Sequence, residues 1–285
     1  MNFDFSEEQN LLREQARRFL DDNAEGKARK ILEGDEPFDY ELWQGMAELG
    51  WMGTVIPEEF GGTGLRHEDL CILAEEIGRS LAPTPFSSSV YLATEAILLA
   101  GSEDQRADYL PRLAAGETVG CFAFGEGLKK PSADSISATF LNGKLSGTKY
   151  PVADGYVADF SVVLARTPDS GPLLVLASLD GAGLEPMETI DPSRSYAKLT
   201  FDDTPAEPLV GVGNGRGLTE RVLDRAAILI AFEQLGGAQK CLELATDYAK
   251  NRFAFGRPIG SFQAIKHKLA DVYIATELAR SHAYY

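Results

Sequence analysis

The segment Arg252–Gln263 separates two long stretches in which apolar residues recur at helical spacing. It brings a fixed cation, aromatic residues, a glycine turn and an amide side chain to one helix junction. Arg252 can fork onto phosphate oxygens, Phe255 can cover a ring, and Gln263 can both donate and accept hydrogen bonds. Such a junction suits a large, flat cofactor that carries a diphosphate. Taken alone, the segment is equally compatible with a plain helix–turn–helix that exposes an arginine.

The formal net charge of −16 on 285 residues argues against nucleic acid or an anionic membrane surface as a partner. A polyanionic small molecule is still allowed where local cations are well placed. No apolar run approaches the length that crosses a bilayer, and the acidic N-terminal residues do not form a signal peptide. The cysteines and histidines are scattered without metal-ligand spacing, which predicts a reducing, cytoplasmic location and no metal site.

Helical periodicity dominates the chain as far as Gly116. Ser6 and Gln9 form a capping-box pattern, in which the two side chains satisfy backbone amides at the start of a helix. Glycine and proline residues divide the later helices, which we expect at 39–49, 67–82, 88–100 and 103–114. The first part of the chain is therefore predicted to be all-α.

Between about Val119 and Val210 the chain changes to short segments rich in valine, phenylalanine and leucine, with turn residues between them. Asn142-Gly143 is a strong hairpin signal. The clearest strands are expected at 121–124, 136–140, 160–164 and 173–178. Several short strands at this spacing predict a small barrel or sandwich.

Helical periodicity returns from Leu218 to about Asn251, and a second helix is expected to open at Ser261 as its N-cap and to continue to Tyr285. The glycine-rich run 211–217 lacks the third glycine of a dinucleotide-binding fingerprint and precedes one long helix, so we expect a linker there. No capping pattern closes the last helix. We therefore expect either a fragment or a shortened helical domain, whose two amphipathic helices should seek another surface.

Three motifs, Pro57–Gly64, Gly147–Lys149 and Arg252–Gln263, occur in the order and spacing of the acyl-CoA dehydrogenase family. The chain resembles that family over essentially its whole length. Family members continue with two more long helices, so the resemblance implies a truncated C-terminal part. It implies an α+β fold with an N-terminal all-α domain, a central β-barrel or sandwich domain and a C-terminal helical segment, at 1–116, 117–214 and 215–285.

Members of this family are flavoenzymes that oxidise the α,β bond of an acyl-CoA thioester. A carboxylate removes the α-proton while hydride passes from the β-carbon to flavin N5. The resemblance therefore implies FAD as cofactor and an acyl-CoA as substrate. It also implies a homo- or hetero-oligomer, dimeric or tetrameric, that passes electrons to an electron-transfer flavoprotein.

The flavin positions of the central β-domain match the family pattern unevenly. Gly125 stands where the family has a threonine whose hydroxyl meets the flavin ring, and Pro151 and Ala153 replace a tryptophan and a second threonine. Two lost hydroxyl contacts would weaken flavin binding by about 0.5–1.5 kcal/mol each. The resemblance assigns to the flavin site of this domain Phe122, Phe124, Gly125, Ser132, Val152 and Ala153.

The half of the flavin site that a neighbouring subunit supplies is better matched, by Arg252, Phe255 and Gln263. The catalytic carboxylate is not identified, because Ala226 occupies the position at which some members carry a glutamate. Glu233 lies on the same helical face about 10 Å further on, as a candidate base or as a buried structural glutamate. A second hypothesis follows: a non-catalytic partner subunit that completes the flavin site of a sister chain.

Overall fold

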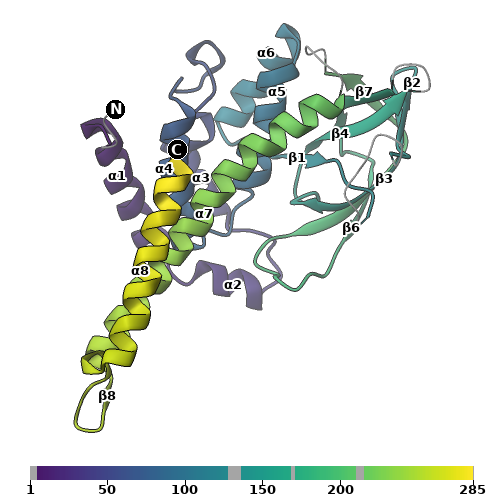
Figure 1. Cartoon of the computed structure of the whole chain (residues 1–285). Helices are drawn as coiled ribbons and strands as arrows, with labels where there is room; N and C mark the ends of the chain where they lie inside the picture. The colour runs from purple at the N-terminus through teal and green to yellow at the C-terminus, as the bar shows by residue number, and fades with distance from the viewer. Residues whose placement is uncertain (1–4, 128–135, 168–170, 210–214, 285) are drawn as a thin grey trace. The chain divides into compact units, whose positions relative to one another are not determined.

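The computed structural model describes residues 5–127, 136–167, 171–209 and 215–284 (Figure 1). Contacts divide the chain into two compact units, which are described separately. The smaller unit comprises Met1–Glu25, Glu68–Ala82 and Ala227–Tyr285, and the larger comprises Gly26–His67 and Pro83–Ala226. The division into three domains at 1–116, 117–214 and 215–285 stays a prediction.

Short helices form the first part of the larger unit. Asp39 caps α3 by accepting the Leu42 amide at 2.8 Å, and Ser102 and Gln105 form a capping box at the start of α6. The helices predicted at 39–49 and 103–114 are thereby confirmed. The helical elements are α2 (Lys27–Glu33), α3 (Tyr40–Glu48), the 3-10 turns η1 (Trp51–Gly53) and η2 (Glu58–Phe60), the π-helix η3 (Ser87–Thr94), α5 (Glu95–Ala100) and α6 (Glu103–Ala114).

The helix predicted over 88–100 is present but is not one regular helix. Its first part is the π-helix η3 and its second part is α5. The consecutive serines Ser87–Ser89 open this segment, and their hydroxyls hydrogen-bond to groups in the strand-rich part of the unit. Serine side chains compete with the regular backbone bonding of an α-helix, which accounts for the wider winding here.

The strands form a sheet that closes on itself. Its order is β1-β4-β2-β3-β7-β5, and β5 pairs in turn with β4, so the first of the two alternatives predicted from the sequence, barrel or sandwich, is the one formed. Asn142 and Gly143 join β2 to β3 with φ of 51° and 75°, the conformation that the hairpin signal requires. The strands are β1 (Gly120–Ala123), β2 (Thr139–Leu141), β3 (Lys144–Ala153), β4 (Phe160–Thr167), β5 (Gly171–Ser178), β6 (Gly183–Pro186) and β7 (Tyr196–Pro208).

The strand predicted at Ile136–Phe140 is shorter in the structure and begins at Thr139. The amides of Ser137 and Ala138 donate to the carboxylate of Glu126, at 2.7 and 2.9 Å, and so they are not available to a neighbouring strand. A side-chain acceptor therefore replaces the sheet ladder at the start of β2.

One apolar core joins the barrel to its helices within this unit. Phe122 and Val162 from the sheet pack with Ile97 and Leu110 from the helices, and all four are almost completely buried. Gly120 lets β1 approach η3, because a Cβ there would lie 2.6 Å from the Ala93 side chain. The close approach packs the start of β1 against the π-helix.

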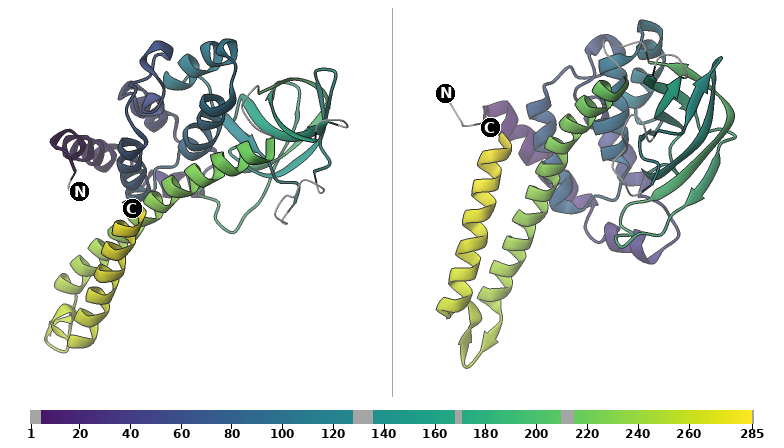
Figure 2. Two further views of the ribbon diagram at one scale, coloured as in Figure 1. Left: turned by 45° about the horizontal axis from the view of Figure 1, so that its top comes forward. Right: turned by 45° about the vertical axis from the view of Figure 1, so that its right-hand side comes forward.

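The smaller unit is built from four helices. They are α1 (Glu7–Asn23), the part of α4 (His67–Ser80) after His67, the part of α7 (Gly215–Asn251) from Ala227, and α8 (Gln263–Tyr284). In Figures 1 and 2, α7 and α8 run side by side in opposite directions, with β8 at the tip of the pair. The capping box of Ser6 and Gln9 is confirmed at the start of α1.

Two sequence predictions about the long helices are corrected. Ser261 does not cap α8, because it belongs to the turn η5 (Ile259–Ser261) and its hydroxyl donates to the carbonyl of Pro258 at 2.7 Å. The expected linker at 211–217 falls partly outside the described residues, and its last residues, from Gly215, already belong to α7.

Glycines allow α4 and α7 to cross at backbone contact. A Cβ on Gly78 would lie 2.0 Å from the carbonyl oxygen of Glu233, and a Cβ on Gly236 would lie 1.8 Å from that of Glu75. Real Cβ atoms do not approach so closely. Both glycines are therefore required by the crossing.

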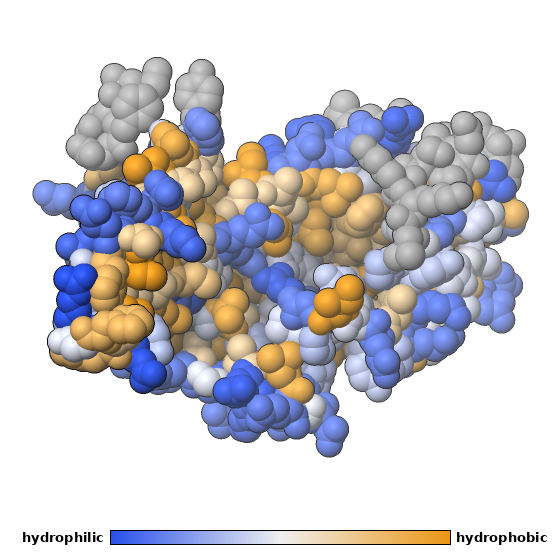
Figure 3. Space-filling model, turned by 60° about the horizontal axis from the view of Figure 1, so that its bottom comes forward, coloured by the Kyte–Doolittle hydropathy of each residue, from blue (hydrophilic) through white to orange (hydrophobic). Residues whose placement is uncertain are grey.

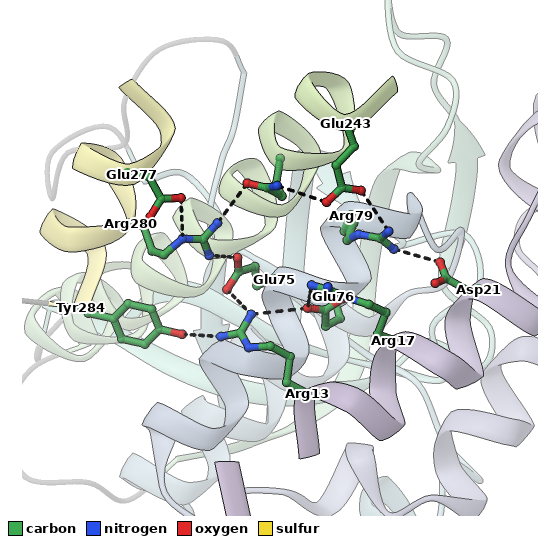
Figure 4. A network of polar contacts seen from close by, with 11 residues as sticks. Arg13, Arg17, Asp21, Glu75, Glu76, Arg79, Glu243, Glu277, Arg280 and Tyr284 are labelled. Carbon is green, nitrogen blue, oxygen red and sulfur yellow. Dashed lines mark hydrogen bonds and ion pairs between the residues drawn. The ribbon is translucent and has the colours of Figure 1, made fainter. Parts of the chain in front are cut away.

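An ion-pair network surrounds this crossing (Figure 4). Glu75 and Glu76 of α4 are almost fully buried, which is costly unless cations compensate them. Glu75 accepts from Arg13 of α1 at 2.7 Å and also from Arg280 of α8. Arg17 forks onto Glu76 at 2.8 and 3.0 Å. The two carboxylates thereby tie α1 and α8 to α4.

Large apolar side chains remain exposed on α7 and α8. On the face of the molecule shown in Figure 3, orange apolar groups lie at the surface among blue hydrophilic ones. Exposed apolar surface of this kind favours association with another surface. The residues of α7 and α8 that are between 45% and 60% exposed are Ile228, Leu244, Tyr248, Val272, Tyr273, Ile274 and Leu278.

Two neighbouring glycines of α7 test the helix crossing. Gly236→Ala should lower the free energy of unfolding by about 1–3 kcal/mol or more, because the new Cβ overlaps the backbone of α4. Gly237→Ala is the matched control: its Cβ would meet only the Gly78 carbonyl oxygen, at an ordinary 3.8 Å. Alanine favours the helix there by up to about 1 kcal/mol. Urea unfolding of both variants would contradict the crossing if the two changes had equal effects.

Candidate functional site

A buried ion pair supports the strand that carries the expected flavin positions. Lys149 of β3 is 0% exposed, and its Nζ donates to Glu126 Oε1 at 2.7 Å. The same carboxylate accepts the hydroxyl of Ser137 at 2.5 Å, besides the two amides at the start of β2. Glu126 thus joins the segment after β1 to both β2 and β3.

The electrostatics of this pair follow from burial and bonding. Burial by itself would raise the pKa of Glu126, but the bonds from Lys149, Ser137 and the Ala138 amide outweigh it and lower the pKa to about 2. Burial lowers the pKa of Lys149, although Glu126 opposes that change. Each charge is thus stabilised by the other in a place where neither would be stable alone.

Two backbone hydrogen bonds join the segment after β1, which contains the expected flavin position Gly125, to Tyr150 of β3. Gly125 accepts the amide of Tyr150 at 3.0 Å, and the amide of Gly127 donates to the Tyr150 carbonyl at 2.9 Å. A Cβ on Gly125 would lie 3.3 Å from that carbonyl oxygen, a tight contact that a threonine would have to relieve by a small shift. The glycine therefore suits the close approach of the two segments.

The side chains at this edge are apolar. Phe122 belongs to the core, and its ring lies 5.9 Å from the half-buried ring of Phe124. Val152 is buried, Ala153 is half-buried, and Pro151 has no amide hydrogen to donate. Phe124, Val152 and Ala153 can therefore offer a flavin apolar surface and backbone groups. Ser132 lies outside the described residues.

The turn between α7 and α8 presents Phe255 to solvent. This turn is the hairpin of β8 (Phe253–Ala254) and β9 (Arg257–Pro258), with Phe255 and Gly256 at φ of 53° and 76°. The Phe255 side chain is 96% exposed, although its left-handed backbone costs about 1–2 kcal/mol for a residue with a Cβ. An exposed aromatic residue in a strained conformation is an indication of function.

Arg252 and Gln263 flank this hairpin and are both exposed. Neither side chain makes a hydrogen bond or ion pair with another residue in the described ranges. The backbone between them is well fixed, because the Ile259 amide donates to the Arg252 carbonyl at 2.8 Å. The hairpin therefore holds a cation, an aromatic ring and an amide ready for a partner molecule. We call the segment Arg252–Gln263 the arm.

The candidate base Glu233 is buried where α7 crosses α4, with its backbone against Gly78. A carboxylate at a tight helix crossing is more typical of a structural residue than of a proton acceptor that must reach a substrate. Ala226, where some family members carry a glutamate, is also buried and has no titratable group. The catalytic role of Glu233 stays a prediction.

Sequence reasoning missed a buried carboxylate that pairs with Arg225, the residue before Ala226. Glu95 of α5 is 3% exposed, accepts from Arg225 of α7 and lies 2.9 Å from the Nε2 atom of His67. Burial by itself would raise the pKa of Glu95, but bonding to His67 and Arg225 lowers it. The only sign of Glu95 in the sequence was a charged residue within the apolar stretch 88–100. Its partners His67 and Arg225 are far away along the chain, so no local pattern links the three residues.

A hollow of about 490 Å³ also opens on the larger unit. Its lining includes Asp35, Tyr156, Met187, Arg194 and Tyr196, and none of the residues predicted for the flavin site. Within the described ranges, no group of three or more potential ligands is placed to hold a metal ion. In the same ranges, no helix combines the length and apolar character needed to cross a bilayer.

Comparison with known proteins gives consistent results along the chain. Residues 6–117 match the family model "Acyl-CoA dehydrogenase, N-terminal domain", and residues 213–285 match "Acyl-CoA dehydrogenase, C-terminal domain". The acyl-CoA dehydrogenase IpdE2 of Mycobacterium tuberculosis is 35% identical over 277 residues, which cover 96% of this chain and 74% of that protein. This chain therefore spans about three-quarters of the length of that relative.

Solved structures give the same fold. A variant of the Tcur3481-Tcur3483 steroid ACAD is 34% identical with a TM-score of 0.85, and the match covers 98% of this chain and 76% of that chain. The complex of glutaryl-coenzyme A dehydrogenase with glutaryl-CoA is 27% identical with a TM-score of 0.91, and the match covers 100% of this chain and 77% of that chain.

The Glu126–Lys149 pair predicts a pH dependence of stability. Glu126 has a lower pKa in the folded chain than its ordinary 4.5, so its contribution is present above pH 4.5 and is lost as the pH falls toward 2. Glu126→Gln should remove this dependence and cost about 3–5 kcal/mol, because it leaves Lys149 buried without its counter-charge. Urea unfolding between pH 2 and pH 7 measures both effects.

An exposed pair on the same domain provides the control. Lys198 donates to Glu185 at 2.9 Å, with both side chains well exposed. Glu185→Gln should change the free energy of unfolding by less than about 1 kcal/mol. Equal effects of Glu126→Gln and Glu185→Gln would contradict a special role for the buried pair.

Proposed function

Because the chain belongs to the acyl-CoA dehydrogenase family, we propose that it works in the FAD-dependent α,β-dehydrogenation of an acyl-CoA thioester. The observation that carries this proposal is the arm, with Phe255 almost fully exposed in a left-handed conformation between Arg252 and Gln263. Within the described residues the Phe255 ring meets the Phe262 ring edge to face, with centroids 6.2 Å apart, and otherwise stands in solvent. A flavin ring system would supply the missing contact.

The residues of the arm fit the chemistry of FAD. The Arg252 guanidinium is suited to the diphosphate, the Phe255 ring to a flat ring face, and the Gln263 amide to polar ring edges. Such a turn would serve a site whose other half lies on a barrel edge like that formed by Phe124 and Ala153. Bound FAD would supply the hydride acceptor of the reaction, while the apolar edge would exclude water from it.

The proton-abstraction step needs a carboxylate near the α-carbon of the substrate. Position 226 supplies none, and Glu233 is the candidate on this chain. Glu95 is buried and already paired with Arg225, so it is held in the charged form by its neighbours and is a weak proton acceptor.

A second candidate function is favoured by the departures from the family pattern. Gly125, Pro151 and Ala153 lack the side chains that bind the flavin in the family, and Ala226 lacks the carboxylate. The arm, in contrast, is complete. These observations favour a non-catalytic partner subunit that lends Arg252 to the cofactor site of a sister chain.

Assembly is part of both candidates. The exposed apolar residues of α7 and α8 support a homo- or hetero-oligomer, dimeric or tetrameric. The solved neighbour is named Tcur3481-Tcur3483, a pair of names that supports a hetero-oligomer for this chain as well. It is also described as a steroid ACAD, which supports a steroid-derived acyl group as substrate. An electron-transfer flavoprotein is the proposed electron acceptor.

The visible absorption spectrum of the purified chain, before and after addition of FAD, tests these candidates. A bound oxidised flavin whose absorption bleaches with an acyl-CoA would support a dehydrogenase that works alone. A folded chain that takes up no FAD would contradict it. Recovery of flavin binding when a second acyl-CoA dehydrogenase chain from the same source is added would then support the partner subunit.

Substitution of Phe255 separates cofactor binding from folding. Phe255→Asn should weaken FAD binding at least tenfold, in this chain or in its complex with a sister chain, because the ring is lost. It should also raise the free energy of unfolding by about 0.5–1 kcal/mol, because asparagine tolerates a left-handed backbone. Phe253→Ala is the matched control, since Phe253 is 64% exposed on the same hairpin and should leave FAD binding unchanged. Equal losses in both variants would argue against a specific contact by Phe255.

A further inference from the structure

Asp154 follows Ala153 at the end of β3 and combines burial with a left-handed backbone. It is 5% exposed and has a φ of 53°. A left-handed conformation is unfavourable for a residue with a Cβ, although aspartate tolerates it better than most. Such a conformation persists in a buried place only where the surroundings determine it. The contacts of Asp154 show what determines it here.

The carboxylate of Asp154 bridges two elements of the larger unit. Oδ2 accepts the hydroxyl of Ser88 in η3 at 2.5 Å, and Oδ1 accepts the hydroxyl of Ser195 at 3.0 Å. The Asp154 amide donates to the Ser195 carbonyl at 2.9 Å. Its own carbonyl accepts the amides of Val157 and Ala158, both at 3.1 Å. Side chain and backbone together hold this residue from several directions.

The neighbouring serines extend this contact along η3. Ser87 accepts from Nη1 of Arg194 at 2.6 Å, and the Ser89 hydroxyl accepts the amide of Gly120 at 3.3 Å. A π-helix is rare and is often found at functional sites. Here the π-helix turns consecutive serines toward the strands, so η3 and the sheet are joined by directional hydrogen bonds as well as by apolar packing.

We propose that Asp154 is a positioning residue, which fixes the edge Tyr150–Ala153 against η3 through Ser88. Apolar contacts allow small sliding movements, whereas hydrogen bonds to both carboxylate oxygens define the position and direction of the strand end. The inference rests on the proposed function in one respect: Val152 and Ala153 are the proposed flavin edge. The side chains of Val152 and Ala153 carry no hydrogen-bonding group, so at these two positions a flavin can be bound only through the backbone, which must be held in place.

Hydrogen exchange of the backbone amides tests the positioning role. Asp154→Ala removes both hydroxyl contacts, and it should speed exchange at Tyr150, Val152 and Ala153 at least tenfold. Asp154→Asn keeps an acceptor and tolerates the left-handed backbone, so exchange there should stay within threefold of the wild type. Ser88→Ala removes one of the two hydroxyl contacts of Asp154, together with the bond to the Pro85 carbonyl, and should give the same local pattern with a smaller increase. It also keeps the test decisive if Asp154→Ala does not fold.

Asp203 provides a matched control on the same sheet. It also has a positive φ, of 49°, and its carboxylate accepts from Ser146 at 3.2 Å and from Lys144 at 3.3 Å, but it is exposed. Asp203→Ala should leave exchange over 150–153 unchanged. The positioning role is overturned if Asp154→Ala and Asp203→Ala give the same pattern, or if Asp154→Ala and Ser88→Ala speed exchange evenly over the whole sheet.

Flavin titration of the same variants separates this inference from the proposed function. Where the wild type binds FAD, alone or with a sister chain, Asp154→Ala should weaken binding at least tenfold and Asp154→Asn should restore it to within threefold. Unchanged FAD affinity in Asp154→Ala would overturn the link to the cofactor. If the wild type binds no FAD under either condition, the proposed function fails, while the exchange data still decide whether Asp154 positions the edge.

Discussion

The central part of this structure depends on one buried ion pair. Lys149 is completely inaccessible to water, and an ammonium group in such a place would be unstable without the carboxylate of Glu126. That carboxylate also accepts the amides that open β2, so one side chain satisfies a lysine, a serine and two backbone groups. Glu126 is thus the common partner of the residues before β2 and of the middle of β3, and its removal would leave both without that link to the segment after β1.

The same strand then carries a second polar anchor at its end. Lys149 is held by Glu126, and five residues later Asp154 is held by Ser88 and Ser195. The edge Tyr150–Ala153 lies between these two anchors. Its backbone is fixed at both ends. A backbone edge can recognise a ligand only if it is rigid, and these anchors supply that rigidity.

The arm differs from this strand edge in its exposure to solvent. Its tip is exposed, and Phe255 is held in an unfavourable backbone conformation by the hairpin around it. The strain is supported by the β8–β9 pairing and by the cation of Arg257, which lies 4.1 Å above the Phe262 ring. Within the smaller unit, α7 is anchored to α4 through the glycine contacts and α8 is anchored to α4 through Arg280. The arm is thus a well-formed element whose aromatic tip stays in solvent.

Local patterns in the sequence were sufficient to predict the Ser6–Gln9 capping box, the Asn142-Gly143 hairpin, the long helices and a barrel or sandwich, because each depends on neighbouring residues or on a short hydrophobic period. The exposed residues of the arm could be selected for the same reason, although their role in a flavin site remains a proposal. Tertiary contacts decided the rest. β2 begins later than predicted because Glu126 accepts the amides of Ser137 and Ala138. The helix predicted at 88–100 is partly a π-helix, because its serines hydrogen-bond to the strand-rich part of the unit. Ser261 bonds back to Pro258 instead of capping α8. The partners of Glu95 and Asp154 lie far away along the chain, and the hydrogen bond or ion pair that gives each carboxylate its role exists only once the fold has brought them within bonding distance.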